Sequence, residues 1–168
     1  LLANHQLDRL LDRRYAPSDV YEQVTLAIGY TARLLASFPG ATRIPPAPEL
    51  ERRKRPADVY DRLIGCFGRV RSIAEHSGLN IARLDRNDVV GMEIAPGDVY
   101  GMATLVVSEL AHIHSQVVDT EAPVRTYYPG QKLPSHVYQR VGTLEAQLIE
   151  LGKQVLAAPQ WLERQPRQ

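Results

Sequence analysis

The sequence predicts an all-α protein in which four helices pack side by side as a bundle. Three observations predict this fold: a nine-residue pattern occurs four times, each copy contains helix start signals, and apolar residues follow each copy at helical spacing. The pattern recurs at intervals of 39, 40 and 38 residues, which is typical of one supersecondary unit used repeatedly. Strand-like alternation of apolar and polar residues occurs nowhere over a comparable length.

The repeated pattern is a helix start signal. It is written APSDVYEQV at 16–24, RPADVYDRL at 55–63, APGDVYGMA at 95–103 and LPSHVYQRV at 133–141. Proline suits the first helical position, because its missing N–H has no partner there and its φ is already helical. The aspartate two residues later, replaced by histidine in the fourth copy, can accept a hydrogen bond at the helix start. We therefore expect helices that begin at the four prolines, Pro17, Pro56, Pro96 and Pro134.

Each start is followed by a predicted helix of about twenty residues with one apolar seam. The apolar positions advance by alternating steps of four and three, which is the spacing of a heptad seam that faces a bundle core. In chain order, the four seams are Val20, Val24, Ala27, Thr31, Leu34 and Phe38; Val59, Leu63, Cys66, Val70 and Ile73; Val99, Ala103, Val106, Leu110, Ile113 and Val117; and Val137, Val141, Leu144, Leu148, Leu151 and Val155.

The predicted connections, 39–55, 78–95 and 118–133, are long for a bundle. Fifteen extended residues span about 50 Å, so a connection can return along a helix of about 30 Å and leave all helices parallel. The alternative is antiparallel packing with folded-up connections; the identical layout of each unit favours the parallel arrangement.

We expect one domain over 1–158, made of repeats at about 16–54, 55–94, 95–132 and 133–158. A short extra helix is expected over 1–14, and a frayed tail over 159–168.

Composition excludes several classes of protein. The formal net charge of +1 provides no general attraction to nucleic acid or to an anionic membrane. The single cysteine, Cys66, rules out an internal disulfide or a thiolate metal site and is predicted to be a small core residue. No apolar run approaches the roughly 18 residues of a membrane span. The chain begins at Leu1, so we expect a processed product or part of a longer protein, and the ratio of seventeen arginines to three lysines suggests a bacterial source.

The tyrosines and aspartates of the motif are the candidate ligand-binding residues. In a parallel bundle they would gather at one end and could bind a small cationic or aromatic ligand. The alternative is a structural role in capping and packing, which fourfold repetition favours because catalysis seldom needs four equal sites. The candidates are Tyr21, Tyr60, Tyr100, Tyr138, Asp19, Asp58 and Asp98.

A column of small residues lies opposite the seams, at Gly29, Gly68, Ser108 and Ala146. Glycine inside a helix costs about 1 kcal/mol relative to alanine, so close approach of another segment should compensate. We therefore expect this column to be an interaction face. The stretches VTLAIGYTA and GMATLVVS, in the helices that begin at Pro17 and Pro96, are almost free of charge, so their outer faces should be covered by connections or another subunit.

Two further patterns could carry chemistry. Glu109 and His112 have the spacing of a di-iron Glu-x-x-His motif, but the chain has no second pair, so no metal site is expected. The basic cluster ERRKR at 51–55 could contact phosphate, but without interleaved aromatic residues a solvated linker is the simpler interpretation. Catalytic triads, phosphate-binding glycine loops and zinc spacings are absent from the sequence.

The leading hypothesis is a non-enzymatic helical repeat bundle that acts as a protein-interaction or scaffolding module and binds a protein partner or a second copy of itself. The alternative is an extracytoplasmic sensory or small-ligand-binding bundle of a bacterial receptor or transport system, which the start at Leu1 permits. No cofactor, metal or nucleic-acid partner is expected in either case.

Overall fold

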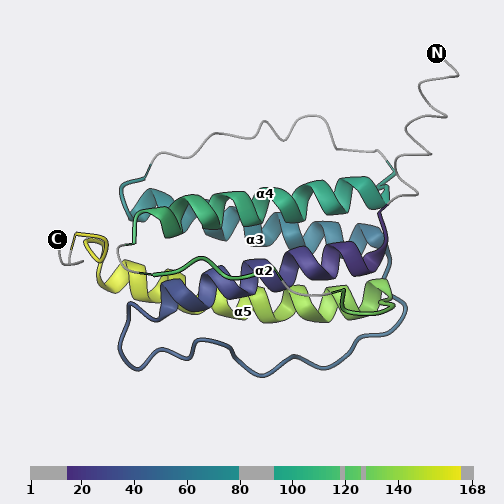
Figure 1. Ribbon diagram of the computed structural model, residues 1–168, viewed down its shortest axis with the longest axis horizontal. Coiled ribbons are helices and arrows are strands. Elements are labelled where there is room, and N and C mark those ends of the chain that lie inside the picture. Colours follow the sequence, from purple (N-terminus) through teal and green to yellow (C-terminus); the bar gives the residue numbers. More distant parts are fainter. Residues whose placement is uncertain (1–14, 80–92, 118–119, 126–127, 164–168) are drawn as a thin grey trace, which may run out of the picture.

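The computed structural model describes residues 15–79, 93–117, 120–125 and 128–163, and shows an all-α four-helix bundle (Figure 1). Its helices are α2 (Pro17–Leu35), α3 (Pro56–His76), α4 (Pro96–Ser115) and α5 (Pro134–Ala157), and each begins at the predicted proline. Helices α2 and α3 both pack against α4 and α5, so α2 and α3 are diagonal partners. Among the described residues, no helix has the length and apolar character needed to span a membrane.

All four helices point the same way. Their first residues surround a single cavity at one end of the bundle, and the ribbon shows the four helices running in one direction from that end (Figure 1). The parallel arrangement that the sequence favours is therefore the one the protein adopts. The long connections make it possible, because each must travel back along the bundle before the next helix begins.

Parallel packing brings four positive helix-dipole ends together, and the motif residues stabilise them. Each helix N-terminus carries roughly half a positive charge, so carboxylates in the first turn are favourable there. Three aspartates accept a hydrogen bond from the backbone N–H three residues earlier, and this confirms the predicted capping. The bonds join Ala16 N to Asp19 Oδ2 (2.7 Å), Arg55 N to Asp58 Oδ2 (2.8 Å) and Ala95 N to Asp98 Oδ2 (2.9 Å). In α5 the acceptor is Nδ1 of His136, 3.0 Å from Leu133 N.

The four predicted seams form the core. Every seam residue is buried, including Phe38 and Val117, which follow the ends of α2 and α4. The buried Thr31 hydroxyl donates to Ala27 O at 2.8 Å, so this polar seam residue is satisfied within its own helix. Burial, with a smaller contribution from Glu145, raises the pKa of the Cys66 thiol to about 12. Cys66 is therefore an unreactive core residue, as predicted.

The C-terminal segment differs from the predicted frayed tail. Trp161 is only 3% exposed, packs against Phe38 with ring centroids 5.3 Å apart and the rings tilted by 40°, and donates from Nε1 to Ser77 Oγ at 2.9 Å. A large aromatic side chain with a satisfied N–H holds residues 159–163 against the bundle. The expected helix over 1–14 and residues 164–168 lie outside the described residues.

Two connections lie along the outside of the bundle, and we call them straps. The α2–α3 strap (36–55) runs along α5, where Gln147 Nε2 donates to Arg43 O at 2.6 Å and Gln139 Nε2 donates to Pro48 O at 2.8 Å (Figure 1). Five strap residues thus match eight helix residues, about 12 Å of helix, so this part of the strap advances further per residue than a helix does.

The α4–α5 strap (116–133, described except for 118–119 and 126–127) runs along α2 over 120–125. Arg33 Nε donates to Glu121 O at 2.6 Å, and Thr120 Oγ1 bonds to His114 Nε2 at 2.8 Å. Pro123 lies directly over Gly29. Helix side chains therefore bind both straps through polar contacts.

We expect His136→Asp to stabilise the fold. An aspartate would keep the acceptor that faces Leu133 N and add the charge that the other three helix starts already have. At low ionic strength, the free energy of unfolding of His136→Asp should exceed that of His136→Asn by about 0.3–1 kcal/mol, because asparagine supplies an acceptor without charge. Urea denaturation of the two variants measures this difference, and equal stabilities would show that the converging dipoles need no fourth carboxylate.

Candidate functional site

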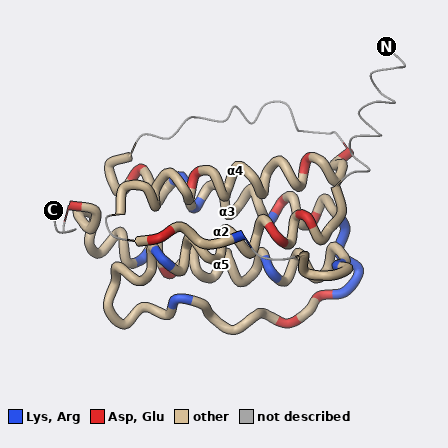
Figure 2. Tube along the Cα trace, in the orientation of Figure 1, with Lys and Arg blue, Asp and Glu red and all other residues tan. Residues whose placement is uncertain are grey.

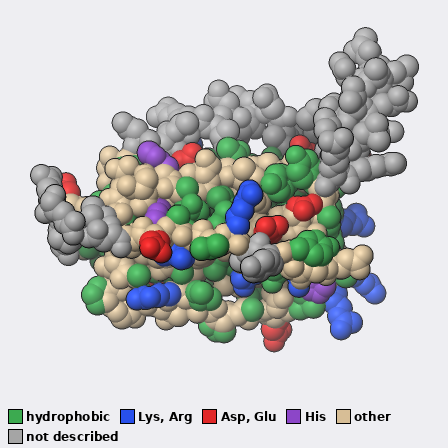
Figure 3. Space-filling view, in the orientation of Figure 1, with side chains coloured by type: hydrophobic (Ala, Val, Ile, Leu, Met, Phe, Trp, Pro, Cys, Tyr) green, Lys and Arg blue, Asp and Glu red, His purple; other side chains and the backbone are tan. Residues whose placement is uncertain are grey.

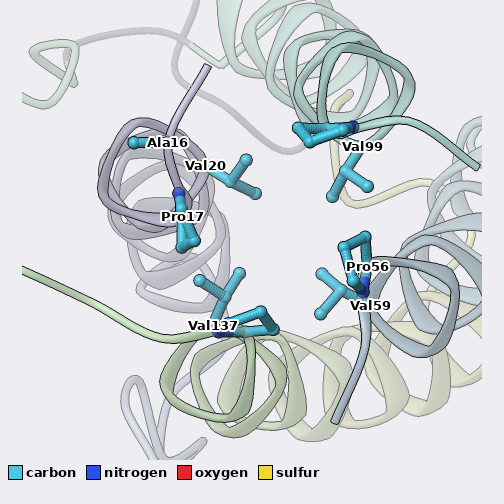
Figure 4. A pocket seen from close by; sticks show the side chains of 9 residues that line it. Ala16, Pro17, Val20, Pro56, Val59, Val99 and Val137 are labelled. Carbon is cyan, nitrogen blue, oxygen red and sulfur yellow. The ribbon is translucent and has the colours of Figure 1, made fainter. Parts of the chain in front are cut away.

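The four helix starts surround a small apolar opening, which we call the proline–valine mouth. It encloses about 50 Å³, and in Figure 4 the labelled valines point toward its centre. Beside Ala16, its walls are the proline and valine of each motif: Pro17, Val20, Pro56, Val59, Pro96, Val99, Pro134 and Val137. Such a space can hold one small apolar group, and its lining offers no titratable side chain.

The motif tyrosines do not line the mouth; two of them lie beneath cations of the chain itself. Each motif tyrosine comes directly after a valine that lines the mouth. The two rings covered by cations are Tyr138 and Tyr21, and one cation at each ring belongs to a neighbouring helix. The contacts to the ring centroids are Lys54 Nζ and Arg62 Cζ over Tyr138, both at 4.4 Å, and Lys132 Nζ at 4.7 Å and Arg140 Cζ at 5.5 Å over Tyr21. These rings already have the cation–π partners that a cationic ligand would supply.

The other two tyrosines are also engaged within the fold. Tyr100 stacks on Tyr15, with centroids 4.4 Å apart and an interplanar angle of 21°. Tyr60 is buried, and burial raises the pKa of its hydroxyl, with smaller contributions from the charges of Asp98 and Asp61. The four motif tyrosines therefore have structural contacts at the start of the bundle.

Four of the seven Tyr–Asp candidates line two separate hollows. Asp19 and Tyr100 line one of about 270 Å³, together with Arg125. Asp58 and Tyr138 line another of about 380 Å³, where Arg62 of α3 also contributes. Neither of these two hollows brings all seven candidates together, and ligand binding by these residues stays a prediction.

The small-residue column is covered at one position and open at two. A Cβ added to Gly29 would lie 2.9 Å from Pro123 Cβ, so the α4–α5 strap uses the absence of a side chain there. Gly68 is partly exposed, and Ser108 and Ala146 are exposed. Within the column, Gly29 therefore makes a contact inside the protein, with the α4–α5 strap. Binding of another molecule by the column stays a prediction.

A groove between the C-terminal halves of α3 and α5, here called the α3–α5 groove, is the feature that sequence reasoning missed. It encloses about 300 Å³. Ile149 and Leu156 line it and are 36% and 61% exposed, whereas the core residues Ile73, Leu148 and Val155 form its floor beside Gly152. The available signal was the seven-residue spacing of Ile149 and Leu156, two helical turns apart and outside the α5 seam.

The polar side chains of this groove are basic or neutral. Arg69, His76 and Lys153 line it, with Ser72, and none of its described lining residues is acidic. Acidic neighbours on the two helices bond elsewhere: Glu75 pairs with Arg71 at 3.3 Å, and Glu150 accepts from Gln154 Nε2 at 2.9 Å. The groove therefore combines an apolar floor with a positive rim.

The remaining chemical candidates stay apart. Within the described ranges, no three His, Cys, Asp or Glu side chains lie close enough to hold a metal ion. Glu109 is partly exposed and His112 is exposed on α4. The basic cluster at 51–55 lies in the strap that leads into α3 (Figure 2), where Lys54 covers Tyr138 and the Arg55 N–H bonds to Asp58.

No protein-family model, curated protein or solved structure matches this chain at a significant level.

His114 connects α4 to the α4–α5 strap. It is 7% exposed, its Nε2 bonds to Thr120 Oγ1 at 2.8 Å, and its ring packs edge-on against Tyr30 with centroids 5.4 Å apart. Burial lowers its pKa from the usual 6.5, and the nearby positive charge of Arg33 lowers it further. The folded protein therefore favours the neutral imidazole more than the unfolded chain does.

This difference predicts that acidification destabilises the bundle. As the pH falls through 6.5, the unfolded chain takes up a proton at His114 before the folded protein does, so stability should decrease until the lower folded pKa is passed. His114→Gln should remove this part of the pH dependence in urea denaturation between pH 7.5 and 5.5, whereas His112→Gln, at an exposed site on the same helix, should keep it. An unchanged slope in His114→Gln would contradict the assignment.

Two glycines of α5 should respond differently to replacement by alanine. At Gly152 a Cβ would meet Ile73 Cγ1 at an ordinary 4.0 Å, so Gly152→Ala should stabilise the helix by up to about 1 kcal/mol. At Gly142 it would lie 2.8 Å from Pro48 Cγ and 2.9 Å from Arg62 Nη2, so displacement of the strap should cancel or reverse that gain. Urea denaturation of both variants compares them, and equal stabilisation would mean that the strap does not need the glycine.

Proposed function

We propose that this protein is a non-enzymatic interaction module, a helical bundle that binds another protein through the α3–α5 groove. The observation that carries the proposal is the exposure of Leu156, 61%, beside Ile149 over an apolar floor. Burying a leucine side chain contributes about 1.5–3 kcal/mol, and apolar side chains that surround a groove are typical of binding surfaces.

The distribution of exposed apolar residues supports this choice of surface. Among the described residues, Ile149 and Leu156 are the large apolar side chains exposed within helices, and the others lie outside them. The nearly uncharged helices α2 and α4 have no exposed large apolar side chain among the described residues, although the sequence predicts excess apolar surface on these two helices. On the face shown in Figure 3, apolar side chains are interspersed with charged ones.

The charge of the groove favours a different protein over a second copy of the chain. In a twofold dimer built on this surface, the same patch faces itself, so Arg69 and Lys153 of both copies would approach one another. Like charges at a buried contact are unfavourable, and this disfavours symmetric self-association. A partner with acidic side chains would instead be attracted to the basic side chains of the groove.

The proline–valine mouth gives weaker support to a sensory or small-ligand-binding role. Its volume of about 50 Å³ is well below the roughly 300–1,000 Å³ typical of small-molecule sites. The surrounding tyrosines are engaged with Lys54, Arg62, Lys132, Arg140 and Tyr15. A ligand there would have to displace contacts that the fold already makes.

Photo-cross-linking in the native cells tests the proposal. A benzophenone side chain at Leu156 should give a discrete protein adduct, whereas the same group at Val124, which is 84% exposed in a strap, should not. The protein identified in the adduct, once purified, should bind the wild-type chain and bind Gly152→Gln at least about tenfold more weakly, because the glutamine side chain fills the groove.

Gly101→Gln is the matched control, because Gly101 is a helical glycine on α4 with open space around its Cβ position. This variant should bind like the wild type. The proposal fails if Leu156 gives no adduct beyond that of Val124, or if the identified protein binds Gly152→Gln as tightly as wild type.

A further inference from the structure

The straps of this protein show how its helices accommodate an outside segment. A helical glycine leaves a notch on the outer surface, and a proline of an extended connection fills it. At Gly29 the filling residue is Pro123, and at Gly142 it is Pro48, with Cβ positions that would be only 2.9 and 2.8 Å from the proline rings. Both notches are closed to any larger helix residue.

Side-chain donors of the helices complete these contacts. Gln139 and Gln147 on α5 donate to strap carbonyls at 2.8 and 2.6 Å, and Arg33 on α2 donates to a third at 2.6 Å. An extended segment leaves its backbone carbonyls without internal partners, so long polar side chains on the helix can bind them. The contact therefore has two parts, a proline in a notch and donors beside it.

The α3–α5 groove has the same two parts without a strap among the described residues. Gly152 provides a notch, because its Cβ position has a single neighbour within 4 Å, Ile73 Cγ1 at 4.0 Å. Arg69 and Lys153 line the groove and can donate hydrogen bonds, whereas the Ser72 hydroxyl lies 3.3 Å from His76 Nδ1 on the same helix. Leu156 and Ile149 flank the notch on α5 and supply apolar contact.

We infer that the groove binds an extended, proline-containing segment of a partner protein that carries acidic side chains, an inference that rests on the proposed function. The proline occupies the Gly152 notch, as Pro48 and Pro123 occupy the other two. Acidic side chains face Arg69 and Lys153, which have no acidic partner among the described lining residues. The α2–α3 strap already has this composition, since Glu49 and Glu51 follow its prolines.

A synthetic peptide tests the inference. Residues 44–51 of the strap, IPPAPELE, provide a probe with acidic residues and prolines, and amide chemical shifts of the full chain report where it binds. We expect saturable shifts at Ile73 and Gly152, and weakening of at least about tenfold for the charge-reversed IPPAPKLK and the proline-free IAAAAELE. Binding should also weaken with added salt. Gly152→Gln should abolish the shifts, and Gly101→Gln should keep them.

Other occupants give different results. Equal binding of IAAAAELE would overturn the role of proline, and tighter binding of an acidic amphipathic helical peptide would identify a helix as the occupant. Concentration-dependent dimerisation that Gly152→Gln removes would identify a second copy. If neither proline peptide shifts groove resonances while Leu156 still cross-links to a partner, this inference is wrong and the proposed function stands; if the cross-link is also absent, both fail.

Discussion

The convergence of four helix N-termini at one end is the constraint on which the rest of the structure depends. Prolines and valines of the four motifs pack around a common axis there, and Asp19, Asp58 and Asp98 offset the like-signed dipole ends that parallel packing brings together. A parallel bundle cannot use short turns, because each chain must return to the same end before the next helix starts. Long connections follow from that requirement, and the described ones lie along the outside as straps.

The straps in turn determine which surface remains for binding. They require glycine where their prolines approach the helix, and they cover α2 at Gly29 and one side of α5 at Gly142. The other side of α5, beside α3, keeps Leu156 exposed above a positive rim. The proposed function uses this surface, and the inferred partner uses the same contact chemistry as the straps.

The candidate site was predictable only in part. The sequence correctly placed the motif tyrosines near one end of a parallel bundle, but it could not show which helix lies beside each ring. Arg62 and Arg140 approach Tyr138 and Tyr21 from neighbouring helices, so these rings are covered by residues distant in sequence. The α3–α5 groove escaped prediction for a related reason: Ile149 and Leu156 form a stripe on one helix, and a groove exists only where a second helix provides its other wall.

The sequence by itself determined the features that depend on neighbouring residues: the four helix starts, the aspartate caps and the seams that form the core. Capping bonds span three residues, and a seam follows from helical periodicity, so both are contained in short stretches of chain. The tertiary structure alone decided the order of helices around the axis, the path of the straps, the docking of Trp161 and the position of the groove. These features depend on contacts between segments far apart in sequence, such as Trp161 with Ser77 and Pro48 with Gly142, whose proximity results from packing.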